Sequence, residues 1–345
     1  RITSRLRKPT TLEPFRHKNF RVLWSVTLVS NLGGLIQAVG AGWMMTTLTS
    51  SNVMVALVQA ATTLPIMMFS LASGALADNF DRRIVMLIAQ TLMLVASVAL
   101  AAAALLDILT PWMLLAITFC LGCGTALHNP SWQASMGDLV PREVLPEAVT
   151  LNSMGFNMMR SVGPAIGGII VAAAGAGAAF VINAFSYLPL IGALLVWKPT
   201  PRSTTLPRED FFSAMSAGLR YVAMSPNLLR VILRAFLFGL AAVAFLALLP
   251  VIASRLPSGS ALIYGTLLGS FGIGAIFGGA ANTSVRKRFS NETIVRGACI
   301  GMALATIGMA SSSNVIIIHL LLLPAGACWV LALSLFNVTV QLSTP

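Results

Sequence analysis

Ten stretches of about twenty or more mostly apolar residues restrict the possible fold of this sequence more than any other feature. A helix needs roughly 20 apolar residues to cross the hydrocarbon core of a bilayer. Placed to within a few residues, the ten runs cover 20–47, 53–77, 84–106, 112–137, 148–174, 178–197, 228–252, 261–282, 293–311 and 315–342. They lack the strict apolar/polar alternation of membrane barrel strands. The sequence therefore predicts an all-α integral membrane protein with ten spanning helices.

Charge is scarce in this chain and unevenly distributed. Charged residues make up 9% of the 345 residues, against about 25% in soluble domains, which excludes a soluble enzyme and a disordered chain. Nineteen of the 22 Lys and Arg residues lie at every second turn between the runs, in 1–21, 79–83, 138–147, 198–230 and 283–296. By the positive-inside rule, we expect the N-terminus on the cytoplasmic side of the membrane. This topology accounts for the net charge of +12 without a nucleic-acid partner.

The longest polar interruption divides the runs into six and four. We expect an N-terminal six-helix bundle over 1–197, a cytoplasmic linker with a short amphipathic helix over 198–227, and a C-terminal bundle of four helices over 228–345. A shift of 204 residues aligns 74–83 with 278–287, and parallel repeats of this kind are a transporter architecture. By the same repeat, we expect the natural protein to continue for roughly 50 to 60 residues, enough for the last two helices.

The turn after the second run carries the pattern G-x-x-x-D-x-x-x-R-R, formed by Gly74, Asp78, Arg82 and Arg83. Gly74 lets two helices approach closely. Asp78 falls at a helix C-terminus, where the helix dipole disfavours an anion, so we expect Arg82 or Arg83 to pair with it. The alternative is an ordinary basic loop that only fixes topology.

The fifth run carries a second pattern around a proline. Pro164 has no N–H, so the carbonyl of Arg160 loses its helical partner and the helix bends. Small residues on this helix provide a face for close packing. The pattern consists of Gly155, Gly163, Pro164, Gly167 and Gly168. A packing helix with a kink is the alternative interpretation.

With these motifs in place, the chain resembles the major facilitator superfamily. The 74–83 loop is similar to its most typical motif, and the motif in the fifth run to its antiporter motif. Segments 14–24 and 139–153 resemble the bacterial group of the enterobactin exporter and related drug-efflux proteins. The resemblance implies two pseudo-symmetric six-helix bundles and a cytoplasmic latch, in which Asp78 and Arg82 pair with Asp138. It also implies that the fifth and eighth spans meet between the halves, and that the protein lies in the bacterial cytoplasmic (inner) membrane.

Polar residues inside the runs are the candidates for a substrate site. A central Arg costs at least about 2.5–3.5 kcal/mol to insert, so Arg160 should face a cavity or a partner; a structural pair or a snorkelling side chain is the alternative. Because the first and fourth spans line the cavity in the superfamily, the expected cavity residues are Asn31, Gln37, His128, Asn129, Trp132 and Asn157. Histidine ordinarily changes charge near neutral pH, so His128 is the best titratable candidate in the runs, although a hydrogen-bonded structural histidine is the other interpretation. No Asp or Glu lies clearly mid-membrane in the residues present, which leaves the proton-carrying residue unidentified.

The sequence gives no indication of catalysis. It has no G-x-S-x-G elbow, no H-E-x-x-H pair and no P-loop lysine, so we expect no enzyme activity, no cofactor and no metal site. We predict a monomeric secondary transporter that exports small amphiphilic, drug- or siderophore-like molecules by alternating access, as a proton antiporter. Its partners are then the substrate, protons and membrane lipids. An importer or lysolipid flippase on the same fold, or a non-transporting scaffold or sensor, are the alternatives.

Overall fold

The computed structural model describes residues 12–199, 220, 223–257 and 259–343, and all regular structure in these ranges is helical. Most of the expected linker 198–227, with its amphipathic helix, lies outside the described residues. The helices are η1 (Glu13–Arg16), α1 (Lys18–Leu48), α2 (Asn52–Asn79), α3 (Arg82–Leu105), α4 (Pro111–Leu139), η2 (Arg142–Val144), α5 (Leu145–Val196), α7 (Pro226–Arg255), α8 (Ala261–Arg288), α9 (Asn291–Ala310) and α10 (Val315–Ser343).

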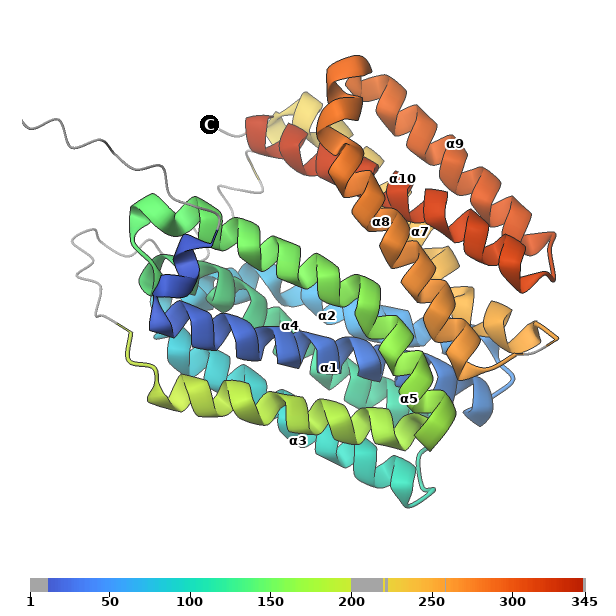
Figure 1. Ribbon diagram of the computed structural model, residues 1–345, viewed down its shortest axis with the longest axis horizontal. Coiled ribbons are helices and arrows are strands. Elements are labelled where there is room, and N and C mark those ends of the chain that lie inside the picture. Colours follow the sequence, from blue (N-terminus) through green and yellow to red (C-terminus); the bar gives the residue numbers. More distant parts are fainter. Residues whose placement is uncertain (1–11, 200–219, 221–222, 258, 344–345) are drawn as a thin grey trace, which may run out of the picture.

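The predicted all-α membrane fold is confirmed, and the fifth and sixth predicted spans follow each other without a loop between them. Within the described ranges, nine helices are long and apolar enough to cross a membrane. The difference from the predicted ten lies in α5, whose 52 residues are roughly 78 Å long at 1.5 Å per residue, more than twice a bilayer core of about 30 Å. At Gly175 the helix breaks, with φ 80° and ψ 168°, and Figure 1 shows α5 turning back there. The fifth and sixth runs are therefore two arms of α5, joined by one glycine instead of a loop.

Side chains at the polar turns define where several helices begin. The backbone N–H groups in the first turn of a helix have no acceptor within the helix. A Ser, Thr or Asp directly before the helix accepts a hydrogen bond from one of them. These capping residues are Ser51, Asp81, Thr110, Ser260 and Ser290. The short turns of the sequence are thus fixed by local hydrogen bonds, while the apolar runs determine the lengths of the helices.

The helices form two groups, α1–α5 and α7–α10, which we call the first and the second group (Figure 1). They meet mainly where α5 packs on α8 and α2 on α7. One end of the molecule holds the α2–α3, α4–α5 and α8–α9 turns with their Lys and Arg residues, and we call it the basic end. At the opposite end, the Arg255 Nη2 donates a hydrogen bond to Asn52 Oδ1 across the two groups, 3.4 Å away. Towards the basic end the groups diverge.

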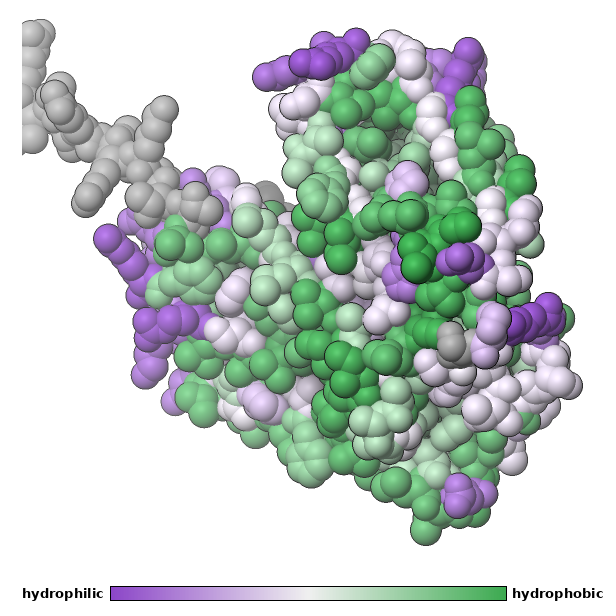
Figure 2. All heavy atoms as spheres, turned by 45° about the vertical axis from the view of Figure 1, so that its right-hand side comes forward, coloured by the Kyte–Doolittle hydropathy of each residue, from purple (hydrophilic) through white to green (hydrophobic). Residues whose placement is uncertain are grey.

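Large apolar side chains cover the outside of the helices. Val95, Phe185, Leu237 and Phe277 are between 56% and 66% exposed. In Figure 2 hydrophobic residues dominate the flanks of the molecule, and hydrophilic residues gather at its ends. Patches this extensive are covered by lipid in a protein of this composition, as expected for a multi-pass membrane protein.

Candidate functional site

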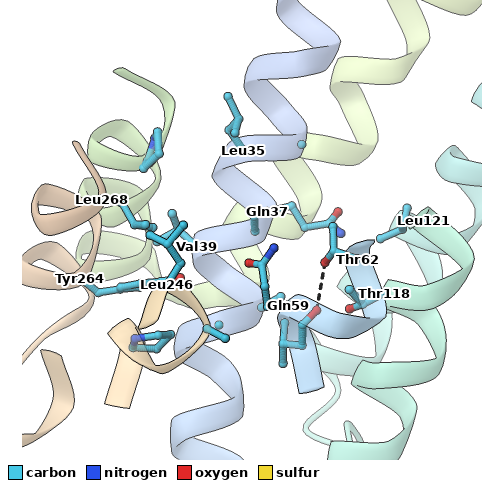
Figure 3. Close-up of a pocket in the computed structure, with 18 of the residues that line it drawn as sticks. Leu35, Gln37, Val39, Gln59, Thr62, Thr118, Leu121, Leu246, Tyr264 and Leu268 are labelled. Carbon is cyan, nitrogen blue, oxygen red and sulfur yellow. Dashed lines mark hydrogen bonds between the residues drawn. The ribbon is translucent and has the colours of Figure 1, made fainter. Parts of the chain in front are cut away.

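A cavity of about 320 Å³ lies between the two groups of helices. Its wall comes from α1, α2, α4 and α5 of the first group and from α7 and α8 of the second. The volume is within the range of small-molecule sites. Figure 3 shows two different sides of it: Gln59, Thr62 and Thr118 on one, and Tyr264, Leu246 and Leu268 on the other. Both groups thus contribute to one site of mixed polarity.

Arg160 is the cationic side chain of this cavity. It lines the wall and stands midway between Leu145, where α5 begins, and Gly175, where it breaks. Within the described residues the guanidinium makes no hydrogen bond or ion pair, and no Asp or Glu is among the residues that line the cavity. Of the two settings expected for this arginine, the structure therefore places it at a cavity.

Gln37 lines the cavity and also joins a buried hydrogen-bond network. Its Oε1 accepts a hydrogen bond from Ser97 Oγ at 3.0 Å and another from Asn183 Nδ2. Asn183 Nδ2 also donates to the Tyr187 hydroxyl at 3.0 Å. The network ties together α1, α3 and the second arm of α5. Gln37 could be identified from the sequence because it is a polar residue inside an apolar run. Ser97 and Tyr187 could not, because serine and tyrosine are ordinary residues in helices.

Three cavity candidates on α4 do not line the cavity. Thr125 of this helix does, but Trp132 lies seven residues, or about 10 Å, nearer the basic end. Trp132 donates its Nε1–H to Asn152 Oδ1 at 3.0 Å, and the Nδ1 of buried His128 lies 3.2 Å from Gln90 Nε2. His128 and Trp132 thus fasten α4 to α3 and α5. The third candidate, Asn129, is exposed outside the lining.

The two remaining cavity candidates also lie outside the lining. Asn31 is half-buried on α1, and Asn157 is exposed on α5. The backbone carbonyl of Asn157 accepts a hydrogen bond from Ser161 Oγ at 3.1 Å. Of the six expected cavity residues, the structure places only Gln37 in the wall. The sequence pattern of a helix shows which face is polar, but not the depth at which two groups of helices separate.

The glycines of the α5 motif face two different helices. A Cβ added to Gly163 would lie 2.9 Å from Leu35 Cβ, and one added to Gly167 would lie 3.0 Å from the Ile36 Cα, both on α1. Gly155 likewise packs against α1 side chains. Gly168 instead faces α8, where an added Cβ would lie 2.8 Å from the Gly265 Cα. Beside these contacts, Pro164 lines the cavity.

At the basic end, the structure brings Arg82 and Asp138 together. Arg82 Nη1 lies 3.2 Å from Asp138 Oδ2, and it donates to the Ala134 carbonyl at 2.7 Å. Arg83 is directed elsewhere, to the carbonyls of Leu194 and Leu195, each at 2.7 Å. It thereby ties α3 to the end of α5.

The remaining residues of this motif, Asp78 and Gly74, are not seen in the contacts expected for them. The side chain of Asp78 lies outside the described residues, so its expected pairing stays a prediction. Among the described residues, nothing lies within 4 Å of a Cβ added to Gly74, so they show no close approach of a second helix at this glycine.

The segment of the second group that aligns with this motif, 278–287, has no acidic residue. Asn282 occupies the position that aligns with Asp78, and its Nδ2 donates to Ser334 Oγ at 2.7 Å. Nearby, Arg234 and Glu292 form an ion pair of 2.7 Å between exposed side chains. A neutral hydrogen bond therefore stands where the repeat would place an aspartate.

Comparison with known proteins identifies the family. A family model named MFS_3, described as "Transmembrane secretion effector", matches residues 9–345. This chain belongs to the major facilitator superfamily of transporters. It is 25% identical over 264 residues to the staphyloferrin A transporter of Staphylococcus aureus, covering 74% of this chain and 64% of that protein. It is 23% identical over 269 residues to macrolide efflux protein A of Streptococcus pyogenes, covering 75% and 65%. The chain thus spans slightly less than two thirds of these relatives.

Solved structures show the same fold at low sequence identity. The nucleoside transporter NupG superimposes with a TM-score of 0.68 at 14% identity, covering 95% of this chain and 83% of that one. An inward-facing, unoccupied bacterial homologue of the human lysosomal transporter Spinster gives 0.68 at 16%, covering 94% and 75%. The family and these relatives are transporters and not enzymes. This superfamily member is accordingly a multi-pass membrane protein of a transporter family.

Proposed function

We propose that this protein is a secondary active transporter that exports small amphiphilic, drug- or siderophore-like molecules from the bacterial cytoplasm by alternating access. The observation that carries the proposal is the cavity, because its wall is shared by two helix groups that meet at one end and diverge at the other. A rocking motion of the groups exposes such a cavity to each side in turn. The named activities of the relatives, a siderophore transporter and a macrolide efflux protein, support this substrate range.

The direction and the energy source form part of the same proposal. If the basic end faces the cytoplasm, as its Lys and Arg residues favour, the divergence of the helix groups opens the cavity inward, where an exporter loads. The antiporter-like motif of α5 favours exchange with protons. The Arg82–Asp138 pair, with Asp78, acts as the conformational latch at the cytoplasmic surface. Residues 1–197 and 228–345 then belong to two related bundles joined by the linker 198–227, within a monomer.

Everted membrane vesicles from an efflux-deficient strain test this function, because their cytoplasmic face is accessible from outside. We expect energised vesicles containing the protein to accumulate a fluorescent amphiphile, and the accumulation to collapse when the pH gradient is dissipated. Vesicles from the same strain without the protein are the control. Uptake confined to right-side-out vesicles would instead show an importer. Movement of a fluorescent lysolipid between leaflets, without accumulation of soluble amphiphiles, would show a flippase.

A further inference from the structure

The charge of the cavity restricts which amphiphiles it can hold. Arg160 lines the wall, and none of the Asp and Glu side chains that the structure describes is part of the lining. Arginine cannot lose its proton in a protein, so the cavity carries a fixed positive charge. Because protein surrounds the cavity on several sides, this charge is screened less than a charge at the protein surface. An empty cavity of this kind repels cations and attracts anions.

The guanidinium has free capacity to bind an oxyanion. It has five N–H donors in a planar fork that matches a carboxylate, and within the described residues none of them is used in a hydrogen bond or ion pair. Other donors stand in the same wall. Thr118 belongs to this wall, and its buried hydroxyl has no hydrogen-bond partner among the described residues. The described residues likewise provide no partner for the Tyr264 hydroxyl. Charge and donors thus favour an anionic group.

The rest of the wall suits an apolar body attached to that group. Leu246 and Leu268 face the cavity on the side of the second group (Figure 3), and Phe271 lies in the same wall. One guanidinium balances one negative charge. A phosphate monoester, which carries nearly two charges near neutral pH, would leave one of them uncompensated in the cavity. The site therefore matches a carboxylate on a hydrophobic frame better than a phosphorylated compound.

We propose that the central cavity is selective for amphiphilic carboxylates, whose carboxylate group binds Arg160. This inference rests on the proposed transport function and names its substrate class. It has a consequence for the driving force: an anion that leaves the cell moves outward down the electrical gradient of an interior-negative membrane. The membrane potential therefore promotes this export directly.

Three probes with one frame and different charges test the selectivity. They are 4-(1-pyrenyl)butyrate, the corresponding amine and the corresponding alcohol, titrated into the purified protein in detergent. We expect the butyrate to bind at least tenfold more tightly than the other two. Arg160→Gln should abolish this preference, and Arg160→Lys should retain part of it, because lysine keeps the charge but not the planar fork. Arg234→Gln is the matched control, since it removes an exposed cation far from the cavity wall and should leave the preference unchanged.

The possible results separate this inference from the function on which it rests. Equal binding of the three probes, no saturable binding of the butyrate, or a preference that survives Arg160→Gln in a protein with unchanged thermal stability would overturn the carboxylate assignment. Transport of the same probes in everted vesicles tests the function separately. Efflux without preference for the anion contradicts only the assignment, whereas selective binding without any efflux contradicts the transport function.

Discussion

Substitution of Gly265 by alanine tests whether close contact between α5 and α8 holds the two helix groups together in this conformation. A Cβ at Gly265 would lie 2.5 Å from the Pro164 carbonyl oxygen and 2.6 Å from the Gly168 Cα. Both are backbone atoms, so no side chain can rotate away. Ordinary contact begins near 3.4 Å, so the helices would have to separate by about 0.9 Å in an otherwise densely packed interface.

The magnitude of the effect follows from this overlap. Forcing a methyl group into a packed contact costs about 1–3 kcal/mol. Because this contact joins the two groups, the cost falls on the conformation in which they touch. A factor of ten in an equilibrium corresponds to about 1.4 kcal/mol, so the population of this conformation should fall roughly 5- to 150-fold relative to conformations with the interface open.

Cross-linking at the opposite end measures that population. The long side chain of Arg255 contacts Asn52 there across the two groups, so cysteines at both positions, in a background without the native cysteines, should be joined rapidly by a short bifunctional maleimide. We expect Gly265→Ala to slow the cross-linking markedly. Gly239→Ala is the matched control, because a Cβ at Gly239 meets nothing within 4 Å. Equal cross-linking rates for the two variants would refute the close-contact argument.

Three further substitutions have definite expected outcomes. Asp138→Asn removes the ionic contact of 3.2 Å between Asp138 and Arg82, which should cost about 1–3 kcal/mol and lower efflux severalfold in vesicles that contain normal amounts of the protein; an unchanged rate would contradict the latch. Asn183→Ala removes a donor to Gln37 and should destabilise the protein by about 1–3 kcal/mol, seen as a lower melting temperature in detergent; a melting temperature equal to that of the unaltered protein would contradict the network's role. Gly175→Ala places a Cβ at φ 80° and should cost about 1–3 kcal/mol in the same assay, whereas an unstrained turn would leave the melting temperature unchanged.

The membrane-spanning helices could be predicted from the sequence because lipid requires about 20 apolar residues in each span. The exception is α5. Two runs were expected as separate helices, whereas the structure joins them through Gly175. The small residues around this position allow a turn within one residue, without the polar loop by which the sequence marks the other turns. Periodicity gives the lengths of the helices but not how abruptly two of them connect.

The candidate site was less accessible from the sequence. The depth of Arg160 in its helix indicated a cavity or a partner, since a central arginine needs one of them, and Arg160 lies in the cavity wall. The proximity of Arg82 and Asp138, 56 positions apart, was suggested by the family resemblance and not by the residues alone. His128 was expected in the cavity because the fourth span lines it in the superfamily, but it packs inside the first group. Where two helix groups separate depends on their packing, which no local pattern encodes.

Accessibility of Gln59→Cys, in a background without the native cysteines, tests alternating access most directly. Gln59 lines the cavity, so a membrane-impermeant thiol reagent can reach this cysteine only through an opening of the protein. The account predicts modification both in everted and in right-side-out vesicles, because the two helix groups expose the cavity to each side in turn. Gly239→Cys, outside the cavity, is the control and should stay unmodified. Modification of Gln59→Cys from one side only, under all energised and de-energised conditions, would contradict the account.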